Sequence, residues 1–107
     1  MSSDDLRDEL AALHEAVDSS PPPAGWSVVT DDRGFAASWT GDAGRWACVR
    51  GTLSTDRPAA ATADVSESRR LGGGWLELAW RTSDPGDVAI AAATHALLDV
   101  LPGRASQ

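Results

Sequence analysis

Apolar residues recur at helical spacing near the start of the chain. Leu6, Leu10, Leu13 and Val17 follow one another at intervals of four, three and four residues, and the remaining positions there are mostly polar. This spacing places one narrow apolar stripe on a helix with a solvated opposite face. It predicts an amphipathic helix over about residues 3–18.

A second helix is predicted near the end of the chain. Asp84 supplies an N-cap, Pro85 suits the first helical position, and the pair Pro102-Gly103 ends the helix after about Leu101. One side of this helix carries Val88, Ala91, Ala92, His95, Leu98 and Leu101, and Ile90, Leu97 and Val100 widen that side. We therefore expect this helix to be well buried.

Between the helices, apolar and polar residues alternate with the period of two that strands show. The alternation and the intervening turn residues predict strands at 26–30, 35–40, 45–54 and 75–82, with a weaker strand at 60–66. The stretch Glu67–Gly74, which ends in three glycines, is interpreted as a loop.

The predicted order is therefore α-β-β-β-β-β-α, which indicates an α+β fold. The simplest packing is an antiparallel meander of four or five strands with the N-terminal and C-terminal helices on one face. We expect one small domain over residues 1–107, with a proline-rich connector at 19–25 and a frayed tail at 104–107.

The charge of the chain narrows its possible partners. The 107 residues carry a formal net charge of −7, and all nine basic residues are arginine. DNA and anionic membrane surfaces are repelled by such a surface, so neither is expected as a partner. Together with the frequent alanine, this composition suggests a high-GC or halophilic origin. In a halophile, the acidic residues would serve to keep the protein surface hydrated.

The sequence offers little for catalysis or metal binding. It has one cysteine and two histidines, which nearly excludes a closed zinc site, and it contains no phosphate-binding, nucleophile-elbow or metalloprotease motif. We expect no cofactor, no catalytic residues and no enzyme activity. The single Cys48, the acidic start and the lack of a long apolar run favour a cytoplasmic protein.

The tryptophans are the most informative residues for function. If Leu76, Leu78 and Trp80 face the core, then the alternate residues of the same strand face the other side: Trp75, Glu77, Ala79 and Arg81. The same parity places Trp46, Cys48 and Arg50 opposite the core residues of their own strand. An exposed surface of tryptophan and arginine is typical of a protein interface, unless the sheet curls and buries the rings.

Three hypotheses follow. The first is an acidic protein-binding module, such as a chaperone-, immunity- or inhibitor-like adaptor, that uses the uncovered sheet face and can form a homodimer there. The second is a small-molecule binder or enzyme with a pocket between the sheet and the second helix around His95, with Asp99 or Cys48. The third is a structural subunit of a larger assembly. For His95 itself, a satisfied core histidine is the favoured interpretation.

Overall fold

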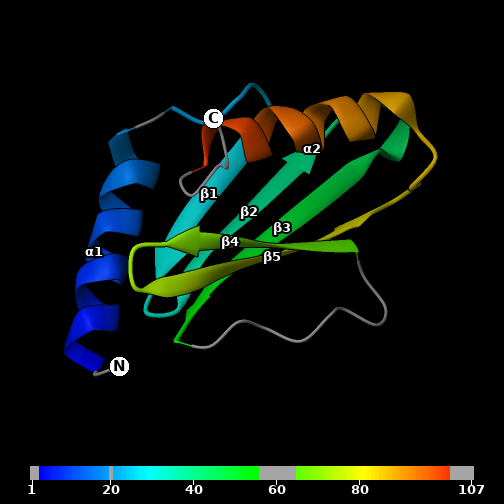
Figure 1. The fold of residues 1–107 in the computed structure, drawn as a ribbon. Coiled ribbons are helices and arrows are strands. Elements are labelled where there is room, and N and C mark those ends of the chain that lie inside the picture. Colours follow the sequence, from blue (N-terminus) through cyan, green and yellow to red (C-terminus); the bar gives the residue numbers. More distant parts are fainter. Residues whose placement is uncertain (1–2, 20, 56–64, 102–107) are drawn as a thin grey trace.

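The chain folds as two helices and one sheet, shown by a computed structural model that describes residues 3–19, 21–55 and 65–101 (Figure 1). The elements are α1 (Ser3–Ser19), β1 (Trp26–Asp31), β2 (Gly34–Thr40), the short 3-10 turn η1 (Asp42–Gly44), β3 (Trp46–Ser54), β4 (Val65–Leu71), β5 (Gly74–Thr82) and α2 (Val88–Val100). The predicted α+β class and its helix–five strands–helix layout are confirmed. The predicted tail at 104–107 lies outside the described residues.

The five strands form one antiparallel sheet in the order β1-β2-β3-β5-β4. The first three strands are neighbours in chain order, as a meander predicts. The last two exchange places, because β5 pairs with β3 and leaves β4 at the edge. This arrangement suits the two sequences, since β5 supplies the apolar Leu76 and Leu78 to the sheet centre.

The fourth strand lies later in the chain than predicted. It covers Val65–Leu71, most of which was interpreted as a loop, and it turns at Gly72 (φ 57°) into β5; of the predicted strand at 60–66, residues 60–64 lie outside the described residues. The prediction failed because charged residues occupy strand positions that face the core. Arg69 is only 9% exposed, and its cost of burial is offset by an ion pair with Glu67 and a bond of 3.3 Å to the Leu101 carbonyl.

Both helices pack on the same face of the sheet, and the core lies between them and the strands (Figure 1). Leu13 carries the apolar stripe of α1 into the core, with Leu10 and Val17 packed beside it. The sheet contributes the alternate residues that the strand period predicts: Phe35, Ala37, Ala47, Val49, Leu53, Leu76 and Leu78.

The buried side of α2 differs from the predicted one. Ile90, Thr94, Leu97 and Leu98 face the core, whereas His95 is exposed. The interpretation of His95 as a core histidine is therefore wrong. Because almost every residue of α2 is apolar, the sequence contained no polar stripe from which the orientation could be inferred.

Specific polar contacts fix the position of α2. The N-cap is Asp87 and not the predicted Asp84, because α2 begins at Val88. The Asp87 carboxylate accepts hydrogen bonds from the N–H groups of Ala89 and Ile90, and Arg45 binds it at 2.7 Å. These contacts lower the pKa of Asp87, chiefly through the Arg45 bond. Farther along the helix, the Trp26 indole N–H donates to the Ala93 carbonyl at 3.1 Å. Among the described residues, neither helix is long and apolar enough to cross a membrane.

Candidate functional site

The sheet face opposite the helices carries no described element of the fold. We call it the open face. Cross-strand register places these side chains on it: Ser27, Val29 and Asp31 from β1; Ala36, Ser38 and Thr40 from β2; Trp46, Cys48, Arg50, Thr52 and Ser54 from β3; Trp75, Glu77, Ala79 and Arg81 from β5; Ser68 and Arg70 from β4. All the residues predicted for the uncovered face are among them.

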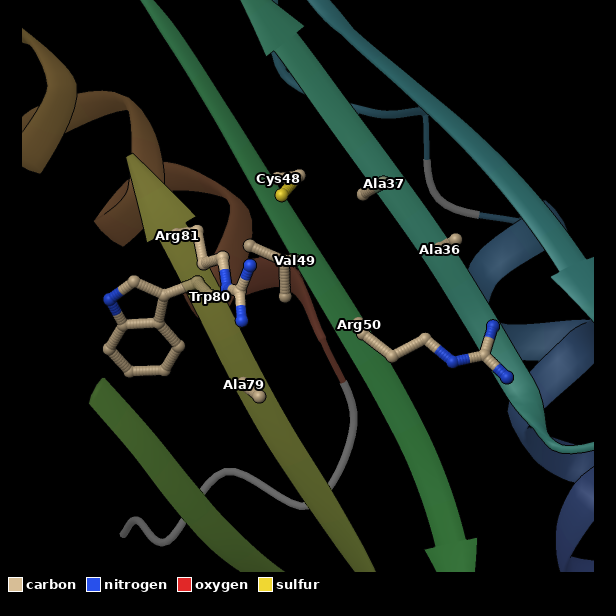
Figure 2. A pocket seen from close by; sticks show the side chains of 8 residues that line it. All are labelled: Ala36, Ala37, Cys48, Val49, Arg50, Ala79, Trp80 and Arg81. Carbon is tan, nitrogen blue, oxygen red and sulfur yellow. The ribbon is translucent and has the colours of Figure 1, made fainter. Parts of the chain in front are cut away.

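The centre of the open face is hollowed. Small residues form its floor, because Ala36, Cys48 and Ala79 lie on three neighbouring strands (Figure 2). The hollow has a volume of about 280 Å³ and is lined by Ala36, Ala37, Cys48, Val49, Arg50, Ala79, Trp80 and Arg81. Its volume falls just short of the range of small-molecule pockets, and it lies open on a flat sheet. It suits a protruding side chain better than an enclosed ligand.

Two arginines border the hollow from opposite sides. The Arg50 side chain runs outward across β2, whereas the Arg81 side chain stays beside β3 and β5 (Figure 2). Arg50 is held by both carboxylate oxygens of Asp31, with 3.2 Å between its second guanidinium nitrogen and Asp31 Oδ1. This bond, helped by the backbone N–H of Arg33, lowers the pKa of Asp31 to about 2. These contacts hold the Arg50 guanidinium in one orientation.

Trp46 and Trp75 lie at opposite ends of the open face. Trp75 pairs with Ser54, eight residues along β3 from Trp46, which corresponds to about 26 Å at the usual rise per residue. Trp46 is 43% exposed. Trp75 is half-buried and lies 5.3 Å from the Arg70 guanidinium, which covers its ring. The tryptophans therefore mark the two ends of one long face.

The alternative site around His95 is not assembled. His95 and Asp99 are exposed on the outer side of α2, while Cys48 is on the open face, so the sheet separates the thiol from the imidazole. Among the described residues, no group of three histidine, cysteine or acidic side chains is placed to hold a metal. The structure therefore gives no Cys-His-Asp arrangement.

Strand parity correctly placed Ala79 on the open face, but Ala36 and Arg70 were not predicted there. Ala36 forms part of the floor of the hollow, and the alternation of its strand already implied that side of the sheet. Arg70, which covers Trp75, was hidden because its strand was interpreted as a loop.

The fold and the open face define a class of protein: over the residues that the structure describes, it is a small α+β chain with one antiparallel sheet that helices cover on one side. Comparison with protein-family models, with curated proteins and with solved structures finds no match to this chain.

Proposed function

We propose that this chain is a small non-catalytic protein-binding module and that the open face is its interface. The observation that carries the proposal is the uncovered sheet face, with an exposed tryptophan at one end and an arginine-bordered hollow at its centre. Interface hot spots are enriched in tryptophan and arginine that surround or fill such pockets. An adaptor, inhibitor or chaperone-like role fits this surface.

The charges on the open face indicate the chemistry of the partner. Three arginines, Arg50, Arg70 and Arg81, are set against Asp31 and Glu77, although the whole chain has a net charge of −7. The open face is thus less acidic than the rest of the molecule. Electrostatic complementarity then favours a neutral or acidic protein surface as the partner, and a free, exposed Cys48 fits a reducing compartment such as the cytoplasm.

Replacement of Trp46 tests the proposal. We expect Trp46→Ala to weaken partner binding at least about tenfold, because tryptophan is enriched among interface hot spots, whose replacement by alanine costs about 2 kcal/mol or more. The wild-type and variant chains would be immobilised, and proteins bound from the cells that encode the chain would be quantified. Val88→Ala is the matched control, since Val88 is 82% exposed on α2, away from the open face.

The reactivity of Cys48 reports directly whether a partner covers the hollow. The thiol is exposed at the floor of the hollow, so a bound partner should slow its modification by a maleimide reagent. A partner whose binding survives Trp46→Ala and leaves the Cys48 modification rate unchanged would disprove the role of the open face. Circular dichroism of both variants confirms that the fold is kept.

A further inference from the structure

The two edges of the sheet differ in how they are protected. The β4 edge carries Glu67, Arg69 and Arg70, and the side chain of Arg69 points to the covered face, where it is almost fully buried. Inward-pointing charges on an edge strand are a common protection against pairing with another strand. The β4 edge is therefore unsuited to accept a further strand.

The β1 edge lacks this protection. Its sequence Trp-Ser-Val-Val-Thr-Asp has no proline and no basic residue, and its pairing with β2 is continuous, without a bulge. Its single charge, on Asp31, is compensated by Arg50. Val29 on the open face is 67% exposed.

Successive residues of β2 bond alternately to β3 and to β1, and this alternation shows which backbone groups of β1 are free. The Gly41 N–H donates to the Arg45 carbonyl at 2.9 Å, continuing the β2–β3 ladder, so the odd-numbered residues of β2 bond to β3. The even-numbered residues of β2 then bond to β1, and alternation directs the N–H and C=O groups of Val28 and Thr30 outward. Within the described part of the chain, no other residue bonds to these four groups.

We propose that the free edge of β1 binds β1 of a second copy of this chain, antiparallel, with the twofold axis at Val29. In this register Val28 of each copy lies opposite Thr30 of the other, and all four free groups of each copy become hydrogen-bonded. The two Val29 residues form a directly opposed pair with about 4.5 Å between their Cα atoms, and each shields the other from water.

A second copy fits this edge better than an unrelated strand for two reasons. The free groups of Val28 and Thr30 are symmetric about Val29, so the edge is complementary to itself. The strand is also nearly neutral within a chain of net charge −7, so the repulsion between two acidic copies is small at this edge. The pairing leaves the open face uncovered and joins two of them side by side.

The molar mass in solution tests the proposal. Light scattering should show a monomer–dimer equilibrium that shifts toward dimer as KCl screens the repulsion between copies. Val29→Lys should raise the concentration at the midpoint of the monomer–dimer equilibrium at least tenfold, because it places two cations opposite each other. Val88→Lys is the matched control: it also replaces an exposed valine and changes the net charge equally, and it should leave the midpoint within twofold.

A cross-link tests the register. In a Cys48→Ser background, Val29→Cys should form an intermolecular disulfide on oxidation, because the expected Cα separation lies within disulfide range. Val88→Cys in the same background should not. A chain that stays monomeric up to millimolar concentration, or a dimer dissociated by Val88→Lys and not by Val29→Lys, would overturn the inference. Partner binding through the open face is scored separately by Trp46→Ala, so either proposal can fail alone.

Discussion

Gly51 lies in the centre of the sheet because the ring of its cross-strand neighbour Phe35 fills the space that a side chain would need. A Cβ atom built on Gly51 would overlap the Phe35 ring, and Phe35 is fully buried. Trp39 is placed in a similar way, with its indole against Gly25 and Gly41. Small residues thus set where the aromatic rings of this core can lie.

Gly51→Ala should therefore destabilise the protein by about 1–3 kcal/mol, because overpacking a filled core forces side chains and backbone to shift. Urea unfolding would measure the loss. Gly86→Ala is the control, since its new methyl group would meet only an ordinary contact at 3.6 Å. Adding Phe35→Leu to Gly51→Ala should recover part of the stability, and no recovery would mean that the ring is not the obstacle.

Asp31 connects the β1–β2 turn to the open face. Its carboxylate binds Arg50 and the backbone N–H groups of Arg33 and Gly34, and the carbonyl oxygen of the same residue lies 2.6 Å from His14 Nε2 on α1. The sequence indicated only the role in the turn. The bond to Arg50 depends on the β2–β3 register, which local sequence patterns do not contain.

Unfolding measured at acid pH should reveal the contribution of the Asp31 carboxylate to stability. The pKa of Asp31 falls from 3.8 to about 2 on folding. A lowered folded-state pKa contributes stability above the unfolded value, and this contribution disappears as the pH falls from about 4 to about 2. In this pH range, the unfolding free energy of Asp31→Asn should therefore depend less steeply on pH than that of the natural chain. Asp32→Asn should keep the slope of the natural chain. Equal slopes for all three proteins would contradict the role of Asp31.

At the scale of elements, the start of α2 depends on Asp87, which combines a helix cap with an ion pair. Asp87→Ala should cost about 1–2 kcal/mol, in line with other N-cap losses. Asp87→Asn should cost less than about 1 kcal/mol, because asparagine still caps and the Arg45 bond is partly exposed to solvent. Thermal or urea unfolding would compare them. Equal losses for both variants would assign the effect to Arg45 instead of the cap.

The elements show what the sequence could predict. Periodicity located both helices and four of the five strands, and strand parity put Trp46 and Trp75 on the uncovered face. It could not locate β4, whose inward Arg69 donates hydrogen bonds to Glu67 and to the carbonyl of Leu101, the residue after α2. One of these partners is a nearby side chain and the other is distant in the sequence, so a pattern of apolar residues predicts neither contact.

At the scale of the whole molecule, the two proposed surfaces share Val29 and are otherwise separate. The side chains of the open face project perpendicular to the sheet, whereas the free N–H and C=O groups of β1 lie in its plane, so pairing at the edge leaves Trp46 and the hollow accessible. A dimer would present two such faces in one continuous sheet. Binding of a partner with two matching surfaces would then gain from avidity without any new contact.

The position of β5 between β3 and β4 also has a consequence for how the chain reaches this fold. The central pairing joins Ala47 to Thr82, whereas β1–β2 and β4–β5 are closed by short turns. Local hairpins form in microseconds, but pairing across such a span must first overcome the entropy of closing the intervening loop. We infer that the local pairings β1–β2, β2–β3 and β4–β5 form first and that the docking of β5 onto β3 limits the folding rate. Until that step is complete, the β3 edge is unpaired.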